Sequence, residues 1–228
     1  MPRLKSDLVD KIFDEIVSRI NHYIYVSGDV VSEISLANEF SISRTPVREA
    51  IFRLIDIGLL VRDKSKVVVK SLNYIDIKEI LEARLALEIM SARTIIQRGG
   101  LTDEEYSELI SLQNEFQHSI SGVNFEKNFE LDANFHTALV KFSGNSRLIE
   151  FANRLNIQSD RFRQITMLTP SRHSITLSEH NEIIKSICDK NFDKTVNALT
   201  FHTNNSIKNY QVILDNDMWY KMIKTLKA

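Results

Sequence analysis

Apolar residues recur at helical spacing through most of the chain. Every fourth residue from Leu8 to Ile20 is apolar, which predicts an amphipathic helix over residues 6–25. A short second helix over residues 33–40 can be capped by the hydroxyl of Ser32. A third helix begins after Ser43 and carries a proline in its first turn, where the missing N–H has no intrahelical partner to lose.

Two short runs of β-forming residues follow the third helix. They cover residues 59–62 and 67–70, and the polar residues 63–66 between them predict a hairpin turn. Three helices followed by a hairpin are typical of the winged helix-turn-helix. We therefore expect a DNA-binding domain over residues 1–72 and a domain boundary at residues 71–73.

The rest of the chain, residues 73–228, contains no further strand pattern. Glycine, proline and asparagine interrupt its helical periodicity at several points. The helices expected here cover residues 76–98, 102–119, 124–142, 146–167, 175–189 and 193–214, with a terminal piece near 217–226. The fold class is therefore mainly α: a winged helix-turn-helix followed by an antiparallel all-α bundle of six or seven helices.

Composition excludes several classes of protein. The chain is 43% hydrophobic and 26% charged, as in ordinary globular proteins. Its one cysteine, Cys188, rules out an intrachain disulfide and a cysteine-based zinc site. No apolar run approaches the roughly 20 residues of a membrane span, and the N-terminus has no signal-peptide pattern. We expect a cytoplasmic protein with no membrane partner.

The distribution of charge matters more than its sum. The net charge of −1 argues against a nucleic-acid-binding protein. Residues 44–70, however, hold seven Lys/Arg against three Asp/Glu, a local excess of four positive charges. Such an excess can be an electrostatic footprint on DNA, although it can also arise by chance.

The third helix presents hydrogen-bond donors at its N-terminal end. Arg44 and Arg48 are four residues apart and share one strip of the helix, beside the hydroxyls of Ser43 and Thr45. A recognition helix meets base edges with its N-terminal residues, and arginine can bind guanine there in bidentate fashion. Arg53 lies about 140° around the helix from Arg48, so we expect it to contact phosphate or solvent.

Residues 36–51 read Leu36-Ala37-Asn38-Glu39-Phe40-Ser41-Ile42-Ser43-Arg44-Thr45-Pro46-Val47-Arg48-Glu49-Ala50-Ile51, and the pattern continues through Leu54, Gly58 and Leu59. This segment resembles the GntR family of bacterial regulators. The resemblance covers about 65 residues. It places Lys64 and Lys66 at the tip of a wing that lies over the DNA backbone or minor groove. The family usually has a glycine in the wing, whereas this tip reads Lys64-Ser65-Lys66; we still expect the wing to form.

Three histidines and one aspartate lie on inward, apolar helix faces. Asp132 and His136 are four residues apart, and His180 and His202 lie on two other helices. A single such histidine is most often a core residue, but a buried aspartate needs a charged partner or a metal. Neutral imidazoles with one carboxylate suit a divalent transition metal: Zn, Ni, Mn or Fe.

Residues 75–215 resemble the FCD domain of FadR-type GntR regulators. The resemblance rests on residues 82–88, on Asp132 to His136 followed by Gly144-Asn145, on residues 179–184 and on His202. It implies that Asp132, His136, His180 and His202 ligate a divalent metal facing a cavity for a small organic acid. Arg84 matches an arginine near that cavity, although an ion pair with Glu88 is an equal alternative. Arg161 and Arg163 are further candidates for effector binding.

Together these features predict a ligand-responsive transcription factor, not an enzyme. A homodimer would bind a palindromic double-stranded DNA operator, and a small carboxylate effector would modulate that binding. The alternatives are a metal-dependent enzyme using the Asp/His3 site and a regulator with a purely structural metal. Against the enzyme, the chain lacks the HExxH spacing, a glycine-rich phosphate loop and an evident nucleophile–base pair.

Overall fold

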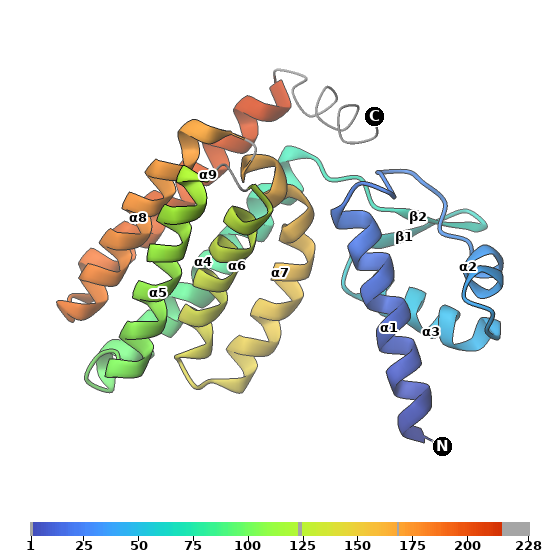
Figure 1. Ribbon diagram of the computed structural model, residues 1–228, viewed down its shortest axis with the longest axis horizontal. Helices are drawn as coiled ribbons and strands as arrows, with labels where there is room; N and C mark the ends of the chain where they lie inside the picture. Colours follow the sequence, from blue (N-terminus) through green and yellow to red (C-terminus); the bar gives the residue numbers. More distant parts are fainter. Residues whose placement is uncertain (1, 123–124, 168, 216–228) are drawn as a thin grey trace. The chain divides into compact units, whose positions relative to one another are not determined.

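The computed structural model describes residues 2–122, 125–167 and 169–215. Contacts divide them into two compact units, which meet in sequence at Asn73 and Tyr74. These residues form nine helices and one two-stranded sheet, which confirms the mainly α fold class (Figure 1). The terminal helix predicted near residues 217–226 lies outside the described residues.

The first unit is a winged helix-turn-helix. Its elements are α1 (Pro2–Asn21), α2 (Glu33–Glu39), α3 (Arg44–Asp56), β1 (Leu60–Asp63) and β2 (Lys66–Val69). The helices α1 and α3 pack together around fully buried Ile16 and Val47. The strands pair antiparallel, with Leu60 opposite Val69 and Asp63 opposite Lys66.

Local chemistry sets the element boundaries in this unit. The Ser32 hydroxyl accepts a hydrogen bond from Ser35 N at 3.3 Å, so it caps α2 as predicted. Gly58 ends α3 in a left-handed conformation, with φ of 78°. The wing forms without a glycine at its tip, because Lys64 itself adopts φ of 54°. That conformation is uncommon for a residue with a side chain and marks a tight turn.

The second unit is an antiparallel helical bundle. It comprises α4 (Tyr74–Gln97), α5 (Asp103–Ser121), α6 (Phe125–Lys141), α7 (Ser146–Met167), α8 (Pro170–Cys188) and α9 (Phe192–Asp215). The prediction for α8 was wrong at one end, since it placed the start at residue 175 and a break at Pro170. Proline instead occupies the first helical position, where its fixed φ suits the helix and no N–H is needed.

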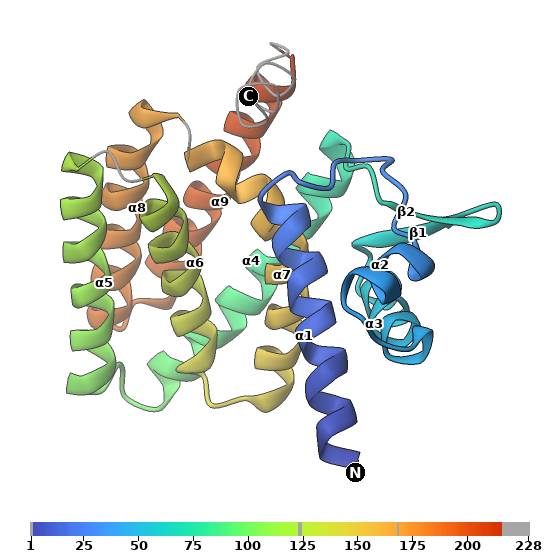
Figure 2. The same ribbon diagram turned by 45° about the vertical axis from the view of Figure 1, so that its right-hand side comes forward.

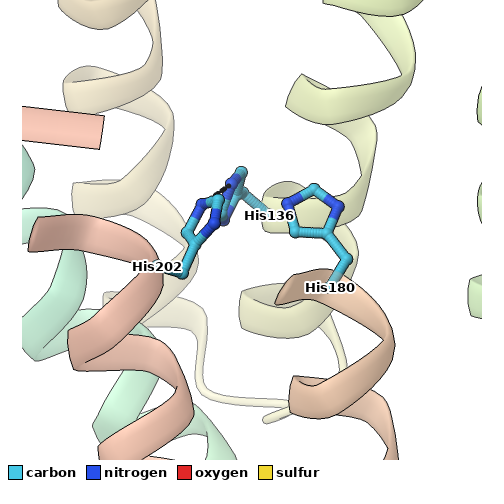
Figure 3. A group of neighbouring side chains, drawn as sticks. All are labelled: His136, His180 and His202. Carbon is cyan, nitrogen blue, oxygen red and sulfur yellow. Dashed lines mark hydrogen bonds between the residues drawn. The ribbon is translucent and has the colours of Figure 1, made fainter. Parts of the chain in front are cut away.

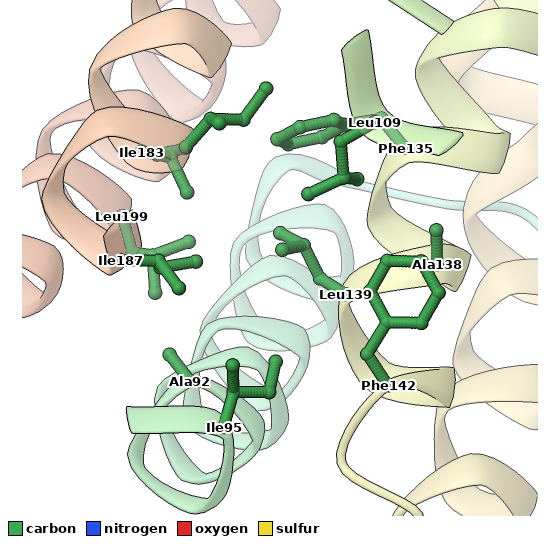
Figure 4. Close-up of a cluster of buried hydrophobic side chains, with 11 residues drawn as sticks. Ala92, Ile95, Leu109, Phe135, Ala138, Leu139, Phe142, Ile183, Ile187 and Leu199 are labelled. Atoms are coloured by element: carbon green, nitrogen blue, oxygen red, sulfur yellow. The ribbon is translucent and has the colours of Figure 1, made fainter. Parts of the chain in front are cut away.

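The bundle is organised around α4, which packs against α6, α7 and α9, while α5 lies beside α6 and α8 (Figure 2). A buried apolar cluster joins five of these helices at one end (Figure 4). Among its members, Phe135 of α6 is fully buried and stacks on the His180 ring, with ring centroids 3.8 Å apart. The apolar core therefore ends directly at the predicted metal ligands.

No described helix is both long enough and apolar enough to cross a membrane.

Candidate metal centre and DNA-binding face

The three predicted histidine ligands meet inside the bundle. His136 comes from α6, His180 from α8 and His202 from α9, and all three rings are almost completely buried (Figure 3). One nitrogen of each ring lies within 4.8 Å of the nitrogens of the other two. Residues far apart in sequence thus bring three potential ligand atoms to one point.

Asp132 lies one helical turn from His136 and faces the same point. Its Oδ1 is 3.6 Å from His180 Nε2 and 3.9 Å from His136 Nε2. Its other oxygen lies 3.2 Å from Nε of Arg163. Burial raises the pKa of Asp132, but interactions with His136, Arg163 and other neighbours outweigh it and keep the pKa below its ordinary value. The ionised carboxylate therefore lies beside two of the three histidines, but it is not part of the group of mutually close ligand atoms that the histidines form.

A buried carboxylate stands behind His136. Oε1 of Glu88 lies 2.9 Å from His136 Nδ1, close enough to attract its proton although the two are not aligned as a hydrogen bond. The same oxygen lies 3.2 Å from Nε of Arg84, so the ion pair considered for Arg84 is present. Burial raises the pKa of Glu88, and Arg84 opposes that rise.

A second buried carboxylate stands behind His202. Oε2 of Glu179 lies 2.8 Å from His202 Nδ1. Arg172 donates to both oxygens of Glu179 at 2.9 and 2.6 Å, and Asn205 donates to Oε1 at 2.7 Å. Burial raises the pKa of Glu179, but these donors outweigh it and lower the pKa to about 2. Glu179 is thus a fixed anion that holds the His202 ring.

The third histidine is held by an amide and an aromatic ring. Gln113 of α5 lies with its Nε2 3.4 Å from His180 Nδ1, and its own Oε1 has no hydrogen-bond partner. Rotating this amide by 180° would let Oε1 accept a hydrogen bond from Nδ1–H. The opposite nitrogen, His180 Nε2, is buried and has no hydrogen-bond partner. It is an unsatisfied polar atom that faces the other ligands.

The protonation pattern fits a cation between the rings. Carboxylates beside Nδ1 of His136 and His202 favour protons there, which leaves lone pairs on both Nε2 atoms. These two Nε2 atoms face each other at 3.3 Å, a contact that needs a proton or a cation between them. Nitrogen ligands at about 2.0–2.1 Å from a tetrahedral Zn²⁺ would lie about 3.3–3.4 Å apart. Burial also lowers the pKa of His136 and of His180, which favours the neutral, ligand form.

A small cavity opens beside the cluster. Its volume of about 20 Å³ suffices for roughly one water molecule. Its polar lining comprises Arg84, Asp132, Arg163, Arg172, Thr176, His202, Ser206 and Tyr210. Arg84, Arg163 and Arg172 are all buried, so three guanidinium groups surround a space next to the histidines. A metabolite would fit only if some of these side chains moved.

Sequence reasoning found only part of this centre. Arg84 and Arg163 line the cavity, whereas Arg161 is buried but is not part of its lining. Arg172, Glu88 and Glu179 were not predicted to act at the site. Glu179 is the sequence neighbour of His180, but its side chain points toward His202 of α9. The available signal was the four-residue spacing of Glu88 from Arg84, which was already predicted to lie near the cavity.

The predicted base-reading arginines share one partner. Arg44 Nη2 and Arg48 Nε each lie 3.1 Å from Oε2 of Glu33, the first residue of α2. Both arginine side chains remain about half exposed, at 54% and 50%. Ser43 is the N-cap of α3, and Thr45 is exposed in its first turn. These four residues therefore lie together at one exposed end of the recognition helix.

The other predicted DNA contacts differ in their surroundings. Arg53 forms an ion pair with Asp10 at 2.5 Å and stacks on the Phe13 ring at 4.6 Å, so it also ties α3 to α1. Lys64 and Lys66 are exposed at the wing tip. Lys66, Arg44 and Arg48 line one open groove between the wing and the helices α2 and α3.

A winged helix-turn-helix followed by a helical bundle with a buried histidine cluster defines a class of two-domain regulators. Residues 8–68 match the gntR family of bacterial regulatory proteins, and residues 79–205 match the FCD domain. The second match covers more than half of the 228 residues. The chain belongs to the GntR family of transcriptional regulators, in the group with a C-terminal FCD domain.

Named relatives support the same class. The chain is 26% identical to the HTH-type transcriptional regulator YdhC of Bacillus subtilis, over 90% of this chain and 92% of the relative. It is 27% identical to the gluconate operon transcriptional repressor of Bacillus licheniformis, over 81% and 77%. Among solved structures, McbR/YncC of Escherichia coli has a TM-score of 0.74 at 20% identity, covering 90% of this chain and 97% of that one. The relatives are transcriptional regulators, so this chain is a regulator and not an enzyme.

Proposed function

We propose that this regulator binds a palindromic operator as a homodimer and that a small carboxylate effector changes its operator affinity through a metal centre. Residues 1–72 would bind DNA, and residues 73–228 would bind metal and effector. The protein would act in the cytoplasm, where its operator lies. A two-fold protein reads a two-fold site, which is why we expect a palindrome.

The observation that carries the metal assignment is the pair of Nε2 atoms on His136 and His202, which face each other at 3.3 Å with carboxylates behind both rings. Asp132, His136, His180 and His202 would hold the ion. Zn, Ni, Mn and Fe all accept this donor set. When bound, the ion would offer a coordination position to a carboxylate oxygen. Glu88 and Glu179 would keep the imidazole rings oriented toward it.

The charge balance of the cavity supports an anionic effector. The buried charged groups in and around it are Arg84, Arg163 and Arg172 against Glu88, Asp132 and Glu179. Three positive and three negative charges cancel, and a divalent ion would change the sum to +2. A carboxylate would offset part of this charge, and a guanidinium can bind a second carboxylate in bidentate fashion. The relative from Bacillus licheniformis is named for the operon of gluconate, which is a hydroxycarboxylate.

Metal content tests the first half of the proposal. Protein purified without chelator or histidine tag should contain a transition metal by elemental analysis, and His180→Ala should remove it. His173→Ala is the matched control, because His173 is equally buried in α8 but is not part of the histidine cluster. Absence of metal in the parent, together with no change in melting temperature on adding Zn, Ni or Mn, would refute the metal centre.

Thermal shifts with small carboxylates test the second half. Mono- and dicarboxylates should raise the melting temperature of metal-loaded protein by mass action, and should have no effect on metal-stripped protein. Arg84→Ala should weaken dicarboxylates more than monocarboxylates. The same compounds should change operator affinity, and the operator should change effector affinity by the same factor. A metal that binds while carboxylates have no effect would indicate a purely structural ion.

A further inference from the structure

A single acidic side chain lies between the two arginines expected to read bases. Oε2 of Glu33 lies 3.1 Å from each of three guanidinium nitrogens: Nη2 of Arg44, and Nε and Nη2 of Arg48. Glu33 belongs to α2 and the arginines to α3, so the contact joins the two helices of the helix-turn-helix. Partial burial raises the pKa of Glu33, but the two arginines outweigh it and lower the pKa below its ordinary value. The carboxylate is therefore charged.

Stability alone does not account for this carboxylate. The arginines are half exposed, and exposed ion pairs contribute little to folding. A negative charge on a face that approaches phosphates also weakens DNA binding, because it opposes the counterion-release term. Glu33 thus lowers nonspecific affinity for DNA and adds little to folding stability. A useful role for this carboxylate must therefore lie elsewhere, in the choice of DNA sequence.

The arginines retain enough donors to read bases while they contact Glu33. A guanidinium carries five N–H donors, and a bidentate contact to guanine O6 and N7 uses two. Arg48 directs Nε and Nη2 toward Glu33 and leaves Nη1 unused there; Arg44 directs only Nη2. The carboxylate therefore fixes one edge of each guanidinium and leaves another edge for the DNA.

Glu33 is itself held in place. It follows the N-cap residue Ser32 at the N-terminus of α2, where a negative charge is favoured by the helix dipole. Leu36 and Ala37 anchor the same helix in the core. A free arginine side chain loses rotamer entropy when it is fixed on DNA. Contact with a rigid carboxylate would remove part of this entropy before DNA binds, so less is lost on binding.

We propose that Glu33 is a positioning residue that sets operator specificity, by orienting Arg44 and Arg48 toward base edges and by lowering their attraction to phosphates. The inference rests on the proposed operator reading by these arginines. It predicts that removing the carboxylate loosens sequence selection while nonspecific binding becomes tighter. A role in folding alone would alter neither in that pattern.

The experiment is a parallel selection from a pool of random-sequence DNA duplexes, because the operator need not be known. Full-length parent and Glu33→Gln are compared. Glu39→Gln is the matched control: it makes the same charge change on the same helix, but Glu39 pairs with Arg19. Parent and Glu39→Gln should enrich one palindromic motif. Glu33→Gln should enrich the same motif with weakened preference at the positions that depend on Arg44 and Arg48.

Fluorescence anisotropy on the selected duplex and a scrambled duplex supplies the magnitude. The affinity ratio should fall about tenfold in Glu33→Gln, at the lower end of the value of a bidentate base contact. Its salt slope on scrambled DNA should steepen by about 0.9, as expected for one added phosphate contact. Glu33→Asp, which keeps the charge on a shorter stem, should recover part of the ratio. Melting curves of the free proteins establish that each variant is folded.

The outcomes separate this inference from the proposed function. If Arg44→Ala and Arg48→Ala lose selectivity while Glu33→Gln keeps the parent's ratio and salt slope, operator reading stands and the role of Glu33 is wrong. If Glu33→Gln gains affinity equally on both duplexes, the carboxylate only repels phosphate, and the positioning role is again wrong. If the arginine variants select the parent's motif unchanged, the recognition-helix assignment itself fails.

Discussion

Replacing Glu88 by glutamine should weaken metal binding while leaving all four proposed ligands in place. Glu88 Oε1 lies 2.9 Å from His136 Nδ1, and both side chains are only 1% exposed. Glutamine keeps the shape of glutamate, and its amide oxygen can still accept a hydrogen bond from Nδ1. Arg84 and a bound cation both favour the ionised carboxylate, so in the metal-loaded protein the change removes one charge behind the imidazole and little else.

The size of the effect follows from two opposing charges. A carboxylate about 6 Å from a divalent ion contributes roughly 5 kcal/mol at an effective dielectric constant of about 20. Arg84, with its Nε 3.2 Å from the same oxygen, cancels much of this attraction. We therefore expect the binding free energy of the metal to weaken by about 1.4–2.7 kcal/mol, which corresponds to a 10- to 100-fold loss of affinity. This is the usual effect of losing a residue that orients a metal ligand.

Competition of apo-protein with a chromophoric zinc chelator would measure this loss. Glu182→Gln is the control, because Glu182 is an exposed glutamate of α8 and its replacement changes the net charge equally. Urea unfolding of both apo variants separates a weaker site from a weaker fold. Zinc affinity equal to or above that of the parent in Glu88→Gln would refute the coupling between this carboxylate and the metal centre.

Three further predictions concern pH, the wing and the core. Burial lowers the pKa of His136 and of His180, so below about pH 6.5 the unfolded chain binds protons that the folded chain does not. The free energy of unfolding of the apo-protein, measured in urea, should therefore decrease as the pH falls. The slope should be up to about 1.4 kcal/mol per pH unit for each histidine. A flat profile between pH 7 and 5 would contradict this. Lys66→Ala should weaken selected and scrambled duplexes alike and reduce the salt slope by about 0.9, whereas a sequence-dependent loss would assign Lys66 to base reading. Phe135→Ala should cost about 3–5 kcal/mol, because its ring is fully buried and stacked on His180; a loss below about 1 kcal/mol in urea would show that the core collapses around the gap.

Local patterns carried most of the prediction. Helical periodicity, the serine before α2 and the glycine after α3 depend on neighbours in sequence, so these elements were predicted to within a few residues. The start of α8 at Pro170 was missed because proline is read as a break, although it is favoured at a first helical position. The family motif between residues 36 and 59 identified the DNA-binding domain, which the family match confirms.

The histidines and Asp132 could be predicted to point inward, because one helix face suffices for that inference. Their convergence depended on how α6, α8 and α9 pack, which spacing within one helix does not determine. The same holds for Glu33, whose arginine partners are 11 and 15 residues away on another helix, and for Glu179, which reaches His202 on α9 instead of its neighbour His180. The sequence by itself determined the elements and their inward faces. Tertiary packing alone decided which charges became partners, because it determines which helix faces meet.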